Sequence, residues 1–154
     1  MWAIGGTAYV YRIYGVHCCL NVVTGPQGIP QAVLIRAIQP TLGVEIMQHN
    51  RECKDIRQLA SGPAKLCQAL GIDTRLNWAD LTAPDLFIAP PQGATPSPES
   101  IVVTTRVGLS RNRGEDRLLR FCLTSCPYVS RPRASPGHAA VLPLADGPET
   151  ESDF

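Results

Sequence analysis

GTAYVYRIYGVHCCLNVV, residues Gly6 to Val23, is the stretch of sequence that decides the fold. Its first half, Tyr9 to Ile13, is a run of aromatic and β-branched side chains that is typical of a strand. Tyr14 and Gly15 then interrupt the alternation and indicate a turn. Val16 to Val23 is apolar apart from a few polar residues and is expected to return as a second strand. The stretch therefore predicts a tight β-hairpin with a tyrosine at its tip.

The tyrosines of this hairpin allow two interpretations. Tyr9, Tyr11 and Ile13 share one parity, so in a strand their side chains lie on the same face. Two tyrosines on one face and Tyr14 at the tip would suit a protein that stacks on flat rings and wedges something apart. The alternative is that these tyrosines belong to an ordinary strand core, where aromatic residues are enriched in any case.

The rest of the chain mixes strand and helix patterns without regular βαβ alternation. A helix with Leu42, Ile46 and Met47 on its apolar face is expected first. A second helix should begin with Ser61 as its N-cap, place Leu66, Ala69 and Leu70 toward the core, and stop at Gly71. The expected elements beyond the hairpin are strands at 31–38, 86–89, 101–105 and 118–124, and helices at 42–53 and 61–71.

These patterns predict an α+β fold built as a single compact domain. The expected domain, with its strands and a few helices, covers residues 1–130. Residues 131–154 are rich in Pro, Ala and acidic side chains with little apolar periodicity, so a disordered tail is expected there. The chain length supports one domain with a sizeable core.

The net charge of +1 is unevenly distributed along the chain. Four of the 13 acidic residues lie beyond position 145, so the preceding part holds 14 basic against 9 acidic residues, a net charge of +5. Seven arginines lie between Arg106 and Arg133, and such a segment could follow the phosphates of a nucleic acid. The alternative is a solvated loop with scattered charge.

Two further basic side chains stand in patterned positions. Arg36 lies within an apolar row of its predicted strand, and a buried guanidinium is costly unless it is paired or coordinates something. An edge arginine that reaches solvent is the alternative. Lys65 falls in the first turns of the second helix, where exposed amides and a cation could meet a phosphate. A simply solvated lysine is the competing interpretation.

The six cysteines do not have the spacing of a metal site. No C-x-x-C pair occurs, and several cysteines lie inside apolar runs, where a free thiol behaves as a small hydrophobic group. We therefore expect no metal and a reducing compartment. No apolar run reaches the length of a membrane span, and the amino terminus lacks a signal-peptide pattern.

Four ordered motifs resemble the alkyladenine (3-methyladenine) DNA glycosylase family. The hairpin matches the family's G-x-x-Y-V-Y-x-x-Y-G pattern with a following Asn, here Asn21. The other three matching segments are VLIRAIQP at 33–40, SGPAKLCQALGI at 61–72, and TRVGLS at 105–110 with LRFCLTSCPYVS at 119–130. The resemblance covers about residues 6–130, and four blocks in the right order are a specific signal.

This resemblance implies a compact domain around a curved antiparallel β-sheet from which the hairpin protrudes. It also implies a monofunctional base-excision enzyme that acts on double-stranded DNA. Such an enzyme hydrolyses the N-glycosidic bond of flipped alkylated or deaminated purines, such as 3-methyladenine. It would act as a monomer without a membrane or cofactor, in the bacterial cytoplasm (nucleoid) or the nucleus, and would not be secreted. The flipped purine would stack on Tyr11, supported by Tyr9, while Tyr14 fills the gap left in the duplex.

The remaining roles also come from the resemblance. Asn21 matches the asparagine that crowds the exocyclic amino group of an ordinary guanine. Arg36 and the backbone carbonyl of Val107 match the groups that hold the hydrolytic water. Contacts to the DNA backbone are expected from Lys65, Arg106, Arg111 and Arg113.

One departure from the family pattern affects the predicted activity. The family's general base is a glutamate in an E-x-Y segment upstream of the hairpin, and this sequence starts at Met1 just before the hairpin. Glu45, Glu52 and Glu99 lie in segments unlike the catalytic one. We therefore expect the polypeptide as written to be nearly inactive. Two alternatives stay open, namely a damaged-DNA-binding remnant without catalysis and a small-molecule domain that holds an aromatic ligand.

Overall fold

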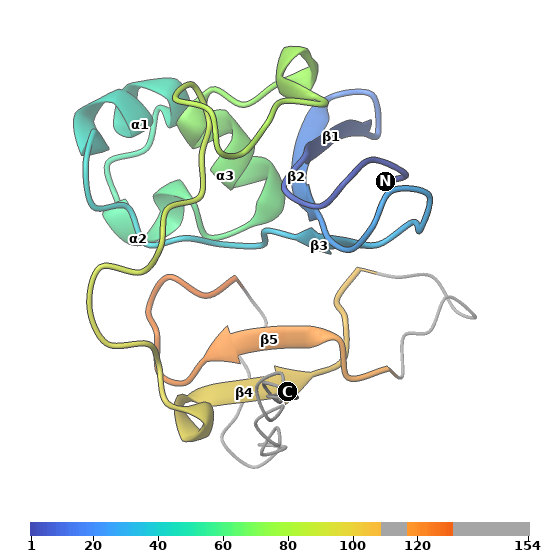
Figure 1. Ribbon diagram of the computed structural model, residues 1–154. Helices are drawn as coiled ribbons and strands as arrows, with labels where there is room; N and C mark the ends of the chain where they lie inside the picture. The colour runs from blue at the N-terminus through green and yellow to red at the C-terminus, as the bar shows by residue number, and fades with distance from the viewer. Residues whose placement is uncertain (109–116, 131–154) are drawn as a thin grey trace. The chain divides into compact units, whose positions relative to one another are not determined.

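The computed structural model describes residues 1–108 and 117–130, and these have the α+β architecture predicted from the sequence (Figure 1). The chain divides into two compact units. Of the described residues, the N-terminal unit comprises 1–92 with 127–130, and the C-terminal unit comprises 93–108 with 117–126. The tail predicted at 131–154 lies outside the described residues.

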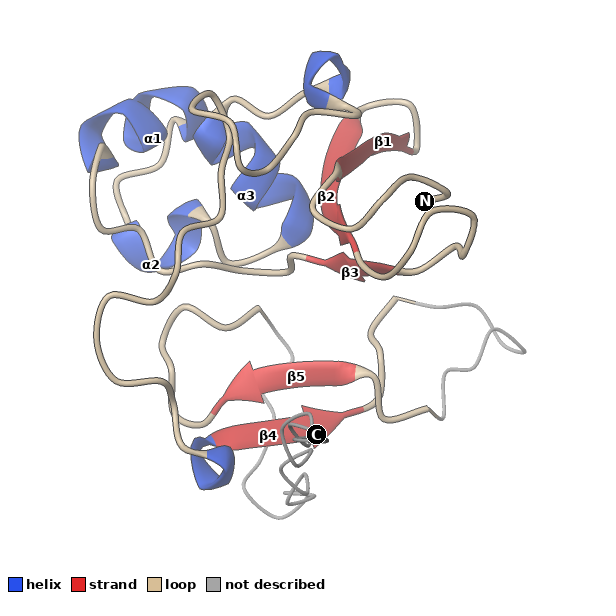
Figure 2. Ribbon diagram, viewed as in Figure 1, coloured by secondary structure: helices blue, strands red, loops and turns tan. Residues whose placement is uncertain are grey.

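The N-terminal unit contains an antiparallel sheet with strand order β1-β2-β3, built from Ala8–Ile13, His17–Val23 and Ala32–Leu34 (Figure 2). The predicted hairpin is therefore confirmed. The third strand is much shorter than the predicted 31–38. Its pairing ends after the Ile35 amide donates to the Leu20 carbonyl, because the Ile38 amide bonds instead to Ala60 in the helical part of the unit.

Three α-helices follow in the described part of this unit, α1 (Val44–Arg51), α2 (Ile56–Leu59) and α3 (Pro63–Leu70). The helix predicted from residue 42 begins only after Gly43. This residue is the N-cap and has a left-handed φ of 65°. Leu42 consequently lies outside the helix and is 84% exposed. The predicted apolar face was wrong for Ile46 as well, which is 66% exposed, whereas Met47 is buried.

The second predicted helix, α3, is confirmed in its extent but not in all its details. Gly62 rather than Ser61 is the N-cap, and the helix makes no side-chain cap hydrogen bond. Gly71 ends it as predicted, with a left-handed φ of 66° that glycine adopts without strain. The core-facing stripe includes Cys67, which is buried, and leaves Leu70 40% exposed.

The core of the N-terminal unit lies between one face of the hairpin and α3. Leu66 from α3 is completely buried there. The buried residues of this cluster are Ala8, Val10, Leu20, Ala60, Leu66, Cys67, Ile72 and Leu81. Because Ala8 and Val10 alternate with Tyr9 and Tyr11 along the strand, the two tyrosines lie on the other face. They are half-buried and do not belong to this core.

The C-terminal unit contains a two-stranded antiparallel sheet of β4 (Ile101–Thr104) and β5 (Arg120–Leu123), which confirms the last two predicted strands. Short 3₁₀ turns occur at Thr74–Leu76 in the N-terminal unit and Pro98–Ser100 in the C-terminal unit. The strand predicted at 86–89 is not formed. That segment makes a backbone hydrogen bond from Ile88 to Leu81 but no ladder, and Ile88 is 58% exposed.

The outer edge of β1 is covered by the segment that contains Trp78. Ala8 exchanges hydrogen bonds with this segment, donating to the Ala79 carbonyl and accepting from the Trp78 amide. The amide of Val10 donates to Asn77 Oδ1 at 3.0 Å. These bonds hold Trp78 at a φ of 74°, a left-handed conformation that is costly for any residue with a β-carbon.

Replacing Trp78 with glycine should therefore stabilise the protein. The side chain is 60% exposed, so little packing is lost. Relief of the left-handed strain, about 1–2 kcal/mol, outweighs the entropic cost of glycine, about 0.5–1 kcal/mol. Urea unfolding should show a free energy of unfolding about 0.5–1 kcal/mol higher for Trp78→Gly. Trp78→Ala keeps the strain and is the control; an equal gain in that variant would contradict this explanation.

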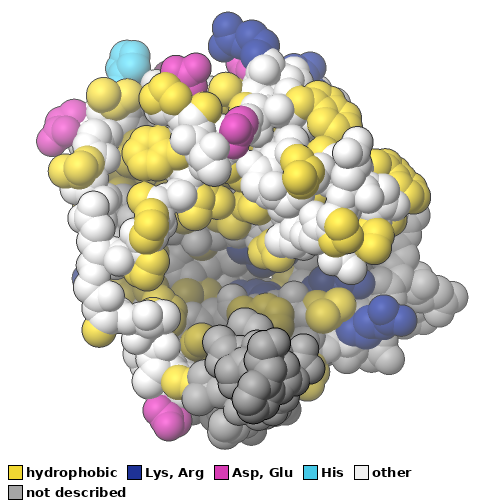
Figure 3. Space-filling model, viewed as in Figure 1, with side chains coloured by type: hydrophobic (Ala, Val, Ile, Leu, Met, Phe, Trp, Pro, Cys, Tyr) yellow, Lys and Arg dark blue, Asp and Glu magenta, His cyan; other side chains and the backbone are white. Residues whose placement is uncertain are grey.

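Apolar side chains reach the surface of the N-terminal unit at many points, as the yellow atoms in Figure 3 illustrate. Trp2 and Ile4, for example, are 63% and 66% exposed.

All six cysteines are free thiols. Within residues 1–108 and 117–130, no helix has the length and apolar character needed to cross a membrane.

Candidate functional site

The register of the sheet brings the predicted base-binding residues onto one face. Tyr9 pairs with Asn21, and Asn21 pairs in turn with Leu34 on the third strand. Two residues further along β1, Tyr11 pairs with Cys19. Because side chains of directly paired residues point to the same side of a sheet, these residues form two adjacent rows across the face opposite the core.

Arg36 extends the second of these rows. It has the parity of Leu34, and the bond from the Ile35 amide to the Leu20 carbonyl, 3.0 Å long, carries the pairing one residue beyond β3. Continuation of this register brings Arg36 opposite Cys19. The electrostatics agree, because burial raises the pKa of the Cys19 thiol while the nearby Arg36 guanidinium lowers it. Arg36 thus lies near the row of Tyr11.

The two stacking tyrosines pack against each other. The ring centroids of Tyr9 and Tyr11 lie 5.3 Å apart and the ring planes are inclined by 32°. This tilted arrangement is one that aromatic pairs favour. Beside them Asn21 is 7% exposed, and its Nδ2 donates a hydrogen bond of 3.0 Å to the Tyr9 carbonyl oxygen. The amide plane of Asn21 is therefore fixed relative to the tyrosine pair.

The hairpin tip presents Tyr14 to solvent. Residues 14–16 connect the strands, and the Val16 amide donates to the Ile13 carbonyl at 3.2 Å. Tyr14 is 84% exposed at a φ of 52°, next to Gly15 at a φ of 72°. An exposed aromatic residue in a strained conformation is unfavourable for stability alone, and such outliers are a reason to suspect function.

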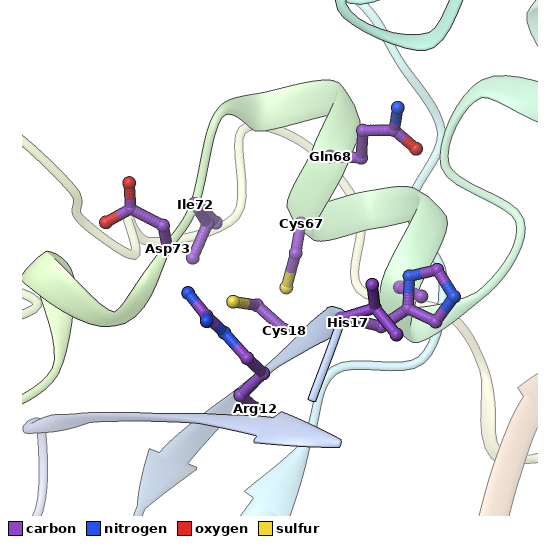
Figure 4. A pocket seen from close by; sticks show the side chains of 9 residues that line it. Arg12, His17, Cys18, Cys67, Gln68, Ile72 and Asp73 are labelled. Carbon is purple, nitrogen blue, oxygen red and sulfur yellow. The ribbon is translucent and has the colours of Figure 1, made fainter. Parts of the chain in front are cut away.

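A separate pocket of about 420 Å³ lies on the opposite side of the hairpin, against α3 (Figure 4). In Figure 4 the thiols of Cys18 and Cys67 point toward one another, and the Arg12 side chain extends toward Asp73. Cys18 and Arg12 pair with each other on the core side of the hairpin. This pocket therefore does not include the tyrosine face and is not the expected base pocket.

The structure says less about the roles of the other predicted contact residues. The Lys65 ammonium in α3 donates a hydrogen bond of 2.9 Å to Gln58 Oε1. Arg106 and Val107 follow β4 in the C-terminal unit and are half-buried. Arg111 and Arg113 lie outside the described residues. In the part of the chain that is described, no group of three or more His, Cys, Asp and Glu side chains could hold a metal ion.

Sequence reasoning missed one residue of this face, Cys19. It is 4% exposed and lies directly opposite Tyr11 on the neighbouring strand. The strand register could have identified it, because a hairpin whose loop runs from Tyr14 to Val16 places residues 11 and 19 opposite each other. The two adjacent cysteines were instead interpreted as packing residues, since they lie in an apolar run.

Comparison with known proteins shows the family of this chain. The family profile described as "Methylpurine-DNA glycosylase" matches residues 1–127. This chain belongs to the methylpurine-DNA glycosylase family. The match includes both the hairpin and the strands of the C-terminal unit.

Curated relatives from diverse organisms carry the name "Putative 3-methyladenine DNA glycosylase". The protein from Methanoculleus marisnigri is 48% identical over 132 residues, covering 85% of this chain and 68% of the relative. That from Carboxydothermus hydrogenoformans is 47% identical over 131 residues, 85% of this chain and 67% of the relative. A Nitrosospira multiformis protein is 40% identical, with 64% of its length covered. The chain thus spans about two thirds of the length of these relatives.

Proposed function

We propose that this member of the methylpurine-DNA glycosylase family recognises alkylated or deaminated purines flipped out of double-stranded DNA, as a monomer in the cytoplasmic nucleoid or the nucleus. The observation that carries the proposal is the sheet register, which gathers Tyr9, Tyr11, Asn21 and Arg36 on one face away from the core. A tyrosine pair that served only packing would lie on the other face.

The geometry suits the physical demands of base flipping. Extruding a base from a duplex costs a few kcal/mol, least for damaged or mispaired bases. The exposed ring of Tyr14 can stack in the gap, while Tyr11 offers a flat wall to the extruded purine. A positively charged alkylated purine gains further attraction from an aromatic pocket. The immobilised amide of Asn21 would exclude guanine through its exocyclic amino group, because stacking alone does not distinguish purines.

Bond cleavage would need a water molecule behind the sugar and a carboxylate to activate it. We assign Arg36, together with the carbonyl of Val107, to holding that water, on the basis of their place in the family motif. Glu45 and Glu52 belong to α1 and its C-cap rather than to the sheet, so neither is assigned as the base. The reaction is a hydrolysis and requires no cofactor.

Salt-dependent binding to damaged DNA tests this proposal against a small-molecule-binding domain. The probe is a duplex with one 1,N⁶-ethenoadenine, and the matched undamaged duplex is the control. Affinity should be higher for the damaged duplex and should fall roughly tenfold for every two phosphates contacted between about 50 and about 200 mM salt. Equal affinity for both duplexes, or affinity that does not respond to salt, would count against the proposal.

Replacing Tyr14 with glycine should separate stability from DNA binding. Glycine adopts the left-handed φ without strain, so the melting temperature should not fall. Loss of the wedge should weaken binding to the ethenoadenine duplex about fivefold or more, the lower end of one stacking contact. Gly15→Ala introduces strain at the neighbouring position while keeping the tyrosine and serves as the control. A Tyr14→Gly variant that binds the lesion normally would remove Tyr14 from the proposed mechanism.

A further inference from the structure

Cys19 occupies the centre of the candidate site. It lies on β2, between Tyr11 on one neighbouring strand and the extension of β3 that carries Arg36. Its side chain is nearly inaccessible, at 4% exposure, although it lies on the face away from the core. Few side chains are small enough for that position and can still accept a hydrogen bond, and a thiol is one of them.

Two neighbours lie against the ring of Tyr11. Tyr9 packs against it at a centroid distance of 5.3 Å. Cys19 lies directly opposite Tyr11 on β2, and its thiol is close enough to the Tyr11 hydroxyl to influence that group's pKa, so its sulfur is placed to accept a hydrogen bond from the hydroxyl. Burial and then the proximity of Cys19 raise the pKa of the Tyr11 hydroxyl, so this group remains a protonated donor at neutral pH. Packing against Tyr9 limits the tilt of the ring, and a hydrogen bond to Cys19 would anchor its far end.

We propose that Cys19 is a positioning residue, whose sulfur accepts a hydrogen bond from the Tyr11 hydroxyl and so holds Tyr11 in the orientation needed to stack on the flipped purine. The inference rests on the proposed function, since it assigns Tyr11 as the stacking wall. A ring fixed before binding does not lose rotamer freedom when the base arrives, so fixing it favours binding. Cys19 is expected to act only through Tyr11 and not to touch the base.

The test compares Cys19→Ala with Cys19→Ser, which retains a hydrogen-bonding group. Binding to the ethenoadenine duplex and to the undamaged duplex is measured for each variant by fluorescence anisotropy. Cys19→Ala should lose about three- to tenfold in affinity for the damaged duplex, the effect of one hydrogen bond, with no change for the undamaged duplex. Cys19→Ser should retain most of the affinity. Cys18→Ala, on the same strand but the opposite face, is the matched control.

A double-mutant cycle distinguishes positioning from a general structural role. In a Tyr11→Phe background, which lacks the hydroxyl, Cys19→Ala should have no further effect on lesion affinity. Additive losses, or equal losses for both duplexes, would overturn the inference. If the wild-type chain does not prefer the damaged duplex, the proposed function fails by itself. The contact is then judged by ¹³C-tyrosine NMR, in which Cys19→Ala but not Cys18→Ala should shift the Tyr11 ring resonances.

Discussion

A polypeptide of residues 1–154 should release hypoxanthine from duplex DNA about 10²–10⁴-fold more slowly than a full-length family member of established activity. This range is the usual contribution of a general base. The family resemblance places that base, a glutamate, in a segment that these residues do not contain. The rate should be measured under single-turnover conditions with enzyme in excess, so that slow product release does not hide the chemical step.

The matched control is the same full-length relative shortened to the part that aligns with residues 1–127. Both shortened polypeptides should bind the damaged duplex and cleave slowly. Excision by residues 1–154 at the full-length rate would contradict the prediction and would mean that a carboxylate of this chain is the base. Glu45→Gln and Glu52→Gln variants would then identify it or exclude these two positions.

The sequence predicted the hairpin and the strands of the C-terminal unit well, because alternation and turn residues are local signals. The prediction failed where contacts with distant parts of the chain determine the local structure. The strand predicted to reach residue 38 ends early because the Ile38 amide bonds to Ala60, far along the sequence. Leu42 was assigned to a helix face because its spacing was right, but the left-handed Gly43 begins the helix after it. The periodicity of apolar residues indicates neither the hydrogen-bond partner of the Ile38 amide nor the backbone conformation of Gly43.

The candidate site was predictable to the extent that it follows strand parity. The shared face of Tyr9 and Tyr11 follows from alternation within one strand. Whether that face was core or surface depended on where α3 packs, which the sequence left open. The roles of Cys19 and of the edge formed by Asn77 depend on pairing between strands, and a one-residue change in the hairpin loop would have altered the partner of Tyr11.

Truncating the stacking wall should have the second-largest effect. Tyr11→Ala should lower the affinity for an ethenoadenine duplex by about 5- to 150-fold, equivalent to the loss of one base–aromatic stacking contact. Affinity for undamaged DNA should stay the same, because Tyr11 is half-buried on the sheet face and would meet only an extruded base. Anisotropy titrations with the two duplexes measure both affinities in the same buffer.

Two controls make the Tyr11 result specific to stacking. Tyr11→Phe keeps the ring, so its affinity for the damaged duplex should fall only about three- to tenfold, the effect that we assign to the proposed hydrogen bond with Cys19. Ethenoadenine fluorescence supplies a second measurement, because its quenching on binding should largely disappear in Tyr11→Ala and persist in Tyr11→Phe. If Tyr11→Ala binds the damaged duplex as tightly as the wild type, the flipped base does not stack on this face. The geometry of the tyrosine pair would then need a different explanation, with Tyr9 the next residue to replace, since its ring lies 5.3 Å away.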